Sequence, residues 1–244
     1  MRVNNLNKTL SFFFLGIFAA VLIALPVTGK TLTVSVEGNN YESVQTAIDA
    51  AASGDTLVLT EGVYTGNLVV NKNLTIRGEG SATITASQDA AGHPVIALGP
   101  SEASITLSGL TLKGATKGES GGTCVDTEAG LCPAGISVRG GAELIIEKCL
   151  VTDNYMGGIY LRNESVVIAE SNEITENRGN GVFLRDSSSA TLKNNSIRNN
   201  GGGIDVRDDS RLTASENTIE GSRNQVIALS NKAVASLAKN TITG

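Results

Sequence analysis

Four arginines recur at the last position of a repeated five-residue phrase. The phrase reads Gly-Ile-Ser-Val-Arg at residues 135–139 and returns at 158–162, 181–185 and 203–207. A guanidinium binds a carboxylate or sulfate through two parallel hydrogen bonds. If the fold places them in a row, the four side chains would suit an anionic polymer with regularly spaced charges. They are Arg139, Arg162, Arg185 and Arg207.

The position two residues before each arginine adds three further candidates for this binding face. After Ser137 in the first repeat it holds Tyr160, Phe183 and Asp205, and the two aromatic rings could stack on sugar faces. The alternative is structural, because stacked guanidinium groups can pair with polar residues of the adjoining turn. The arginine position is lost in the fifth repeat, at Ser230. We therefore expect a binding face of four repeats, since a stripe needed only for stacking has no evident reason to end there.

The spacing of these phrases predicts the fold. Apolar columns recur in steps of 23, 23, 22 and 23 residues, and such a period is typical of a solenoid. One column, for example, holds Ile136, Ile159, Val182, Ile204 and Ile227. Each repeat contains three short alternating segments, which predicts three parallel strands per coil around stacked aliphatic side chains.

One further column is polar. It holds Asn172, Asn195, Asn217 and Asn240, with Cys149 in the place of the first asparagine. Asparagines one period apart can form a ladder of side-chain amide hydrogen bonds. Cys149 is then a small buried residue at a turn of the coil rather than a nucleophile, since the single histidine, His93, lies far away in the sequence.

The first 29 residues have the pattern of a secretory signal. Arg2 and Lys8 precede an apolar run from Ser11 to Leu25, and small residues end at Gly29, which predicts cleavage before Lys30. The alternative is a retained membrane anchor, but the run is short for a span of roughly 20 residues. No second apolar segment follows. We therefore expect a secreted, periplasmic or cell-surface protein without a membrane contact after cleavage.

Residues 30–244 read as one domain, in which a first strand at Thr31–Val36 precedes a helix at about 41–52. Its apolar residues Val44, Ala47, Ile48 and Ala51 share one helical face, with Asn40 as the expected N-cap and Gly54 as the stop. Such a helix could cover the apolar end that the first coil of a solenoid would otherwise expose.

Residues 113–133 interrupt the repeat and read as an insertion loop. Cys124 and Cys132 in this loop predict a local disulfide in an exported protein, and a metal site is the less favoured alternative because no histidine lies nearby. The net charge of −5 argues against nucleic acid as a partner.

The repeats and the stretch from Tyr41 to Tyr64 resemble the right-handed parallel β-helix proteins of the pectin-lyase-like superfamily. The resemblance covers nearly all of residues 30–244. It implies an all-β, single-stranded right-handed parallel β-helix solenoid with an N-terminal amphipathic capping helix. It implies little about activity, because this fold carries lyases, hydrolases, epimerases, esterases and proteins without catalysis.

No complete catalytic set of that superfamily is visible, so whether the chain is an enzyme stays open. The hydrolases pair three aspartates with a Gly-His-Gly element, whereas here Asp208 and Asp209 form a lone acidic pair. The lyases hold calcium beside an arginine or lysine base, and a strand with tryptophan accompanies that site; this chain has no tryptophan. We therefore expect no metal or cofactor, with calcium as the candidate if the chain is a lyase.

These patterns favour an exported protein that binds an acidic polysaccharide along the arginine and aromatic face. The alternatives are a polysaccharide lyase or related carbohydrate-active enzyme, and a structural surface protein. The last coil would expose an apolar end, which suggests end-to-end self-association. Its apolar residues are Ile227, Leu229, Leu237 and Ile242.

Overall fold

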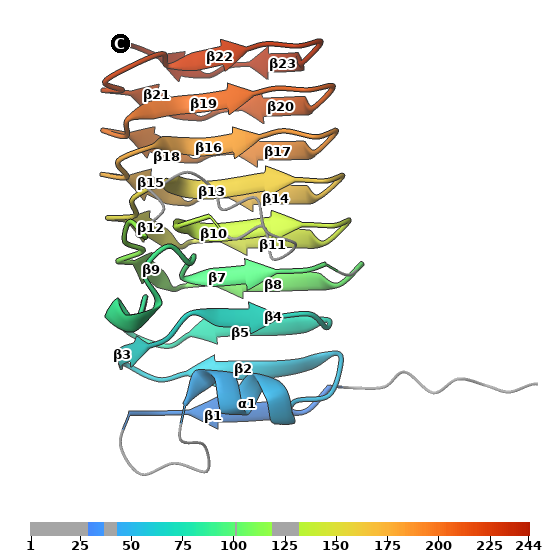
Figure 1. The fold of residues 1–244 in the computed structure, drawn as a ribbon, viewed down its shortest axis with the longest axis vertical. Helices are drawn as coiled ribbons and strands as arrows, with labels where there is room; N and C mark the ends of the chain where they lie inside the picture. Colours follow the sequence, from blue (N-terminus) through green and yellow to red (C-terminus); the bar gives the residue numbers. More distant parts are fainter. Residues whose placement is uncertain (1–28, 37–42, 101, 119–131) are drawn as a thin grey trace, which may run out of the picture.

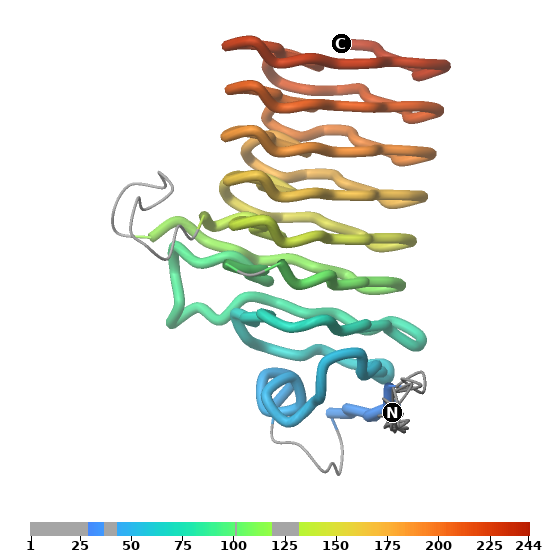
Figure 2. Tube along the Cα trace, turned by 90° about the vertical axis from the view of Figure 1, so that its right-hand side faces the viewer, coloured from blue at the N-terminus to red at the C-terminus, as the bar shows by residue number. Residues whose placement is uncertain are grey.

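Three parallel sheets wind into a solenoid of about eight turns (Figures 1 and 2). This computed structural model describes residues 29–36, 43–100, 102–118 and 132–244. The predicted all-β parallel solenoid is confirmed. Besides the strands, the described residues form one α-helix, α1 (Val44–Ala50), and one 3₁₀ turn, η1 (Gln88–Ala90).

After the first coil, which contributes β1 and α1, each coil contributes one strand to each sheet. Sheet A contains β1 (Thr31–Val34), β2 (Asp55–Leu59), β5 (Leu74–Gly78), β8 (Ser104–Ser108), β11 (Glu143–Glu147), β14 (Val166–Glu170), β17 (Ser189–Lys193), β20 (Arg211–Ser215) and β23 (Val234–Ala238). Sheet B contains β3 (Gly62–Thr65), β6 (Ala82–Thr85), β9 (Thr111–Lys113), β12 (Leu150–Thr152), β15 (Glu173–Thr175), β18 (Ser196–Arg198), β21 (Thr218–Glu220) and β24 (Thr241–Ile242). Sheet C contains β4 (Leu68–Val70), β7 (Ile96–Leu98), β10 (Ala134–Arg139), β13 (Gly157–Arg162), β16 (Asn180–Leu184), β19 (Gly202–Val206) and β22 (Ile227–Leu229).

The strand register confirms the predicted inward columns. In sheet C, Ile136 pairs with Ile159, which pairs with Val182, and the column continues through Ile204 to Ile227. The first four of these side chains are at most 1% exposed. Aliphatic residues therefore stack on aliphatic residues along the whole axis, which is the burial that parallel strands require.

The predicted asparagine ladder is also confirmed, at the corner between sheets A and B. The Nδ2 of Asn172 donates to the Oδ1 of Asn195 at 2.9 Å and to the carbonyl of Ile146 at 2.9 Å. The same pattern continues through Asn217 to Asn240. Cys149 is buried, and its backbone N–H donates to Asn172, so it occupies the first rung as expected.

A second asparagine ladder, which the sequence analysis missed, lies where sheet B turns toward sheet C. Asn154, Asn177 and Asn200 are each at most 1% exposed. The Nδ2 atoms of Asn154 and Asn177 donate to the Oδ1 of the next rung at 3.0 Å. Two parallel ladders therefore hold both ends of the short sheet B strands.

Helix α1 takes the place of a sheet C strand in the first coil. Gln45 lies beside the edge strand β4, where its Oε1 accepts from the N–H of Val69 at 2.9 Å and its Nε2 donates to the carbonyl of Val69 at 3.2 Å. One side chain thus satisfies both backbone groups that the edge would leave open. Lys72 donates from Nζ to the carbonyls of Ile48, Asp49 and Ala51 at the other end of the helix.

The predicted ends of this helix are wrong. Ser43 is the N-cap instead of Asn40, because its extended backbone lets Oγ accept from the N–H of Thr46 at 3.1 Å. The helix ends with Ala51 as its C-cap, three residues before Gly54, because the backbone of Ala51 is already extended. The apolar face is as predicted, since Val44, Ala47 and Ile48 are buried.

Coil length varies at one corner in the second half of the chain. From sheet B to sheet C the chain spans 24 residues from Leu112 to Ile136, but eight from Val151 to Ile159 and seven from Ile197 to Ile204. The other two corners keep one length in these coils. The insertion predicted at 113–133 therefore lies at the corner between sheets B and C.

The last coil is the most exposed part of the described solenoid. Exposed apolar side chains gather there, namely Leu229, Val234, Leu237 and Ile242. End-to-end association through this coil stays a prediction. No helix among the described ranges is long and apolar enough to cross a membrane. The predicted signal segment lies outside the described residues, except for Gly29.

Candidate polysaccharide-binding face

The four arginines form a row along the outward side of sheet C. Arg139 and Arg162 are direct partners in the register of β10 and β13. Arg185 follows β16 and donates its N–H to Leu161, and Arg207 follows β19 and donates to Leu184, so each lies one coil further on. The strand register therefore confirms that successive guanidinium groups start from adjacent rungs.

The residues two positions earlier form the predicted neighbouring column. Ser137, Tyr160, Phe183 and Asp205 pair in order across four strands. The rings of Tyr160 and Phe183 stack with their centroids 4.8 Å apart and an interplanar angle of 22°. The guanidinium of Arg207 lies 5.0 Å from the centroid of Phe183. Phe183 thus contacts an aromatic ring from the preceding coil and a cation from the following one.

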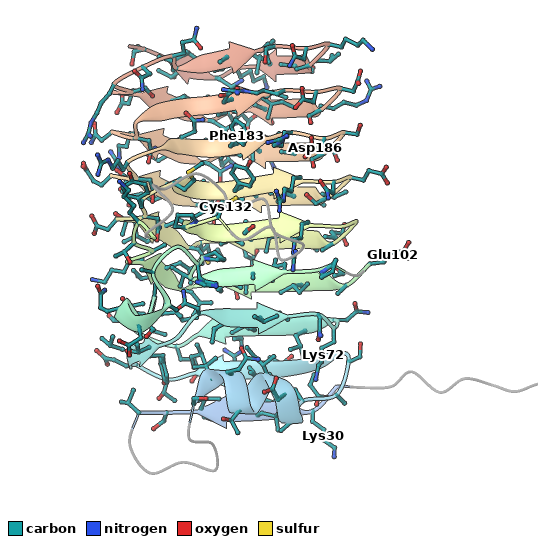
Figure 3. All side chains as sticks on the ribbon, viewed as in Figure 1. Lys30, Lys72, Glu102, Cys132, Phe183 and Asp186 are labelled. Carbon is teal, nitrogen blue, oxygen red and sulfur yellow. The ribbon has the colours of Figure 1, made fainter. Side chains whose placement is uncertain are left out.

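The two ends of this face differ in exposure. Tyr160 is 5% exposed and packs with Cys132, at the end of the insertion, and with Ala134, the first residue of β10. Arg162 is also buried, at 8% exposed, whereas the side chains of Arg185 and Arg207 are 42% and 49% exposed. Figure 3 shows Cys132, Phe183 and Asp186 on the same face. A ligand therefore has better access to Arg185 and Arg207 than to Arg162.

Carboxylates on the protein already pair with the accessible arginines. Arg207 holds Asp205 through two hydrogen bonds, Nε to Oδ1 at 3.0 Å and Nη2 to Oδ2 at 2.6 Å. Arg185 lies 3.1 Å from Asp186 and 4.0 Å from Asp208. This is the pairing expected of a structural ladder. The same guanidinium groups could exchange these partners for carboxylates of a ligand, as Arg185 and Arg207 remain partly exposed.

These contacts, together with burial, shift the pKa values of three arginines and of Tyr160. The hydrogen bond with Tyr160 raises the pKa of Arg185, and the bond with Asp205 raises the pKa of Arg207. Burial, followed by the charge of Arg162, lowers the pKa of Arg139. Burial raises the pKa of the Tyr160 hydroxyl. The row therefore carries fixed positive charge, which suits electrostatic binding rather than proton transfer.

The other chemistry-bearing residues do not converge on one another, and of those named below only Asp208 reaches this face. His93 lies next to η1 before β7, where its Nδ1 is 3.2 Å from the carbonyl of Ala90. Asp208 and Asp209 lie in the turn after β19, which is four strands away from β7 in sheet C. Among the described residues, no group of three His, Cys, Asp or Glu side chains could hold a metal ion. Cys149 is buried, and burial raises the pKa of its thiol to about 11.

The predicted disulfide involves a residue outside the described ranges, Cys124. Cys132 is fully buried in the small cluster with Ala134 and Tyr160. The bridge from Cys124 to Cys132 stays a prediction.

Solved structures with this fold include pectin-active enzymes. A pectin methylesterase in complex with a hexasaccharide matches with 14% identity and a TM-score of 0.51, covering 84% of this chain and 67% of that one. The carrot pectin methylesterase matches with 16% identity and a TM-score of 0.58, covering 87% and 83%. ORF18 of Geobacillus virus E2 has a TM-score of 0.61 at 14% identity, with 85% and 48% covered. Identities this low show the fold alone.

The chain spans 65% of the pectin methylesterase PemA from Erwinia chrysanthemi. Among curated proteins, none matches this sequence. The family model described as "Right handed beta helix region" matches residues 103–242. This chain therefore belongs to the right-handed β-helix family.

Proposed function

We propose that this protein binds an acidic polysaccharide along the outward face of sheet C. The observation that carries the proposal is the row of guanidinium groups in strand register, which spans four coils and stops at Arg207. Adjacent strands lie about 4.8 Å apart, so the row offers a cation at each rung. A polymer with a carboxylate on each sugar presents a matching series of anions.

The accessible part of the face sets the expected mode of binding. Ligand carboxylates would replace Asp186 and Asp205 as partners of Arg185 and Arg207, and the exposed part of Phe183 would lie beside a sugar ring. Because each new ion pair replaces an existing one, the net gain per arginine is small. We therefore expect binding of modest affinity that depends on several arginines together and weakens with salt.

The fold supports this choice of ligand. A pectin methylesterase of the same fold was crystallised with a hexasaccharide. The predicted signal segment would bring the protein to the outside of the cell, where such polymers are found. The same fold likeness favours a second candidate, a pectin-active enzyme, which would release products from the bound polymer.

Affinity electrophoresis in gels containing polygalacturonate tests the proposal. The double variant Arg185→Gln with Arg207→Gln should lose the retardation seen with the wild-type chain. The matched control is Arg198→Gln with Arg211→Gln, which removes the same charge from sheets B and A. It should keep the retardation.

The outcomes separate the three functions. Equal loss in both double variants would mean attraction by overall charge and would contradict a specific face. An unretarded wild-type chain would favour a structural surface protein. Unsaturated sugars or methanol released from pectin would favour the enzyme.

A further inference from the structure

A second feature lies at the corner between sheets B and C, away from the arginine row. Here three successive coils line an open depression of about 290 Å³ in the surface, which we call the corner pocket. The side chains that matter for its chemistry are Thr116, Lys117, Asp153, Tyr155, Glu176 and Arg178. They follow β9, β12 and β15, so each coil contributes two of them.

The backbone under the pocket is fixed by the second asparagine ladder. The Oδ1 of Asn154 accepts from the N–H of Ala115 at 3.1 Å, and the N–H of Asn154 donates to Asn177 at 3.1 Å. The N–H of Tyr155 donates to Ala115, and that of Arg178 donates to Asn154, both at 2.9 Å. The pocket therefore has a preformed floor, which lowers the entropy cost of binding.

The walls combine an aromatic ring with charged groups of both signs. The guanidinium of Arg178 lies 4.7 Å from the centroid of Tyr155, a cation–π contact. Lys117, Asp153 and Glu176 form no ion pair with another described residue. Two cations and two anions give the pocket no net charge. It thus offers carboxylate acceptors, cationic donors and an aromatic edge within one small volume.

We propose that the corner pocket binds one uncharged sugar unit. Its volume lies at the lower end of ligand pockets, about 300 Å³, which suits a single ring. Asp153 and Glu176 accept hydrogen bonds from sugar hydroxyls, while Lys117 and Arg178 donate to hydroxyl or ring oxygens. An acidic sugar is disfavoured because the pocket has no net charge to attract it, so any pairing with Lys117 or Arg178 is offset by the like charges of Asp153 and Glu176. This site does not rest on the proposed function of the arginine row.

A titration followed by ¹⁵N–¹H correlation spectra tests this site on the chain from Lys30 to Gly244. The probes are the methyl glycosides of galactose, glucose, mannose and xylose, with galacturonate as the acidic partner of galactose. At least one neutral glycoside should shift the amides of Lys117, Tyr155 and Arg178. Galacturonate should bind more weakly than the neutral glycoside.

Two variants probe the polar and aromatic walls separately. Tyr155→Ala should weaken neutral-sugar binding by about tenfold, because one ring contact is lost. Glu176→Gln should weaken it by roughly threefold, because a neutral amide oxygen replaces a charged acceptor. The control is Glu216→Gln, at an exposed left-handed turn position like that of Glu176 but at another corner. Its binding should be unchanged.

The proposal is overturned if no neutral glycoside shifts these amides, or if galacturonate binds more tightly. Unchanged binding in Glu176→Gln also contradicts it, and this conservative change keeps the side-chain size. The double variant Arg185→Gln with Arg207→Gln should bind neutral glycosides normally, so the two sites can fail independently.

Discussion

The asparagine ladder predicts a gradient of stability along the solenoid. In Asn195→Ala, four side-chain hydrogen bonds disappear from a position that is 2% exposed. Two are donated by Nδ2, to the carbonyl of Ala169 and to Asn217, and two are accepted by Oδ1 from Asn172, all at 2.9 Å. The partners left behind are buried, so water does not replace the lost contacts.

The magnitude follows from this count. Each hydrogen bond contributes about 1 kcal/mol net, so Asn195→Ala should lower the free energy of unfolding by about 4 kcal/mol. Asn240 makes three such bonds but is only half-buried at the end of the ladder. Water can replace part of them, so Asn240→Ala should cost about 1–2 kcal/mol.

Calorimetry compares the two variants directly. For a chain of this size, 1 kcal/mol shifts the melting temperature by about 2–4 °C. We expect a drop of roughly 10 °C for Asn195→Ala and roughly 4 °C for Asn240→Ala. The control is Asn194→Gly, an exposed neighbour with a φ of 54° that glycine adopts freely, and it should change little. Equal drops for Asn195→Ala and Asn240→Ala would refute the argument that burial sets the cost.

Three further predictions concern buried and edge groups. Burial raises the pKa of Cys149 to about 11 from 9.0, so the thiol stabilises the fold fully below pH 9, and this contribution is lost as pH rises toward 11. Chemical unfolding under reducing conditions compares the wild-type chain with Cys149→Ala. By pH 10.5 the wild-type chain should lose about 2 kcal/mol of its free energy of unfolding relative to the variant. A difference between the two chains that does not change with pH would contradict this. Lys72→Met removes the donor to three carbonyls at the end of α1 and should lower the free energy of unfolding by about 1–2 kcal/mol in the same assay. The control Lys113→Met, on the exposed side of sheet B, should leave the free energy of unfolding unchanged. Gln45→Ala should speed hydrogen exchange at the Val69 amide by about tenfold, while Lys113→Met on sheet B should leave that exchange rate unchanged.

The inward columns of the fold could be predicted because the same burial pattern is repeated in every coil. The second asparagine ladder carried a similar signal, a step of 23 residues between Asn154, Asn177 and Asn200. That signal is hidden by neighbouring polar turn residues, and the column breaks at Arg223. The ends of α1 were mispredicted because Asn40 and Ser43 are both good N-caps, and only the backbone geometry selects one of them.

The candidate site was predictable in its register but not in its contacts. Strand pairing places Arg139 to Arg207 in a row whatever their side chains do. The burial of Tyr160, by contrast, involves Cys132, which returns from an insertion that does not follow the period. The choice of Asp205 as the partner of Arg207 depends on side-chain rotamers within one coil, and no spacing pattern encodes that choice.

The corner between sheets B and C has a consequence for protein engineering. The three sheets keep their register whether this corner spans 24 residues, as before Ile136, or seven, as before Ile204. A foreign peptide grafted between Asn200 and Gly201 would therefore interrupt neither strand, and Asn200 would stay in the second asparagine ladder. Grafts at the equivalent corners of successive coils would stand one strand spacing apart, about 4.8 Å, so the solenoid could display a linear epitope array of defined pitch.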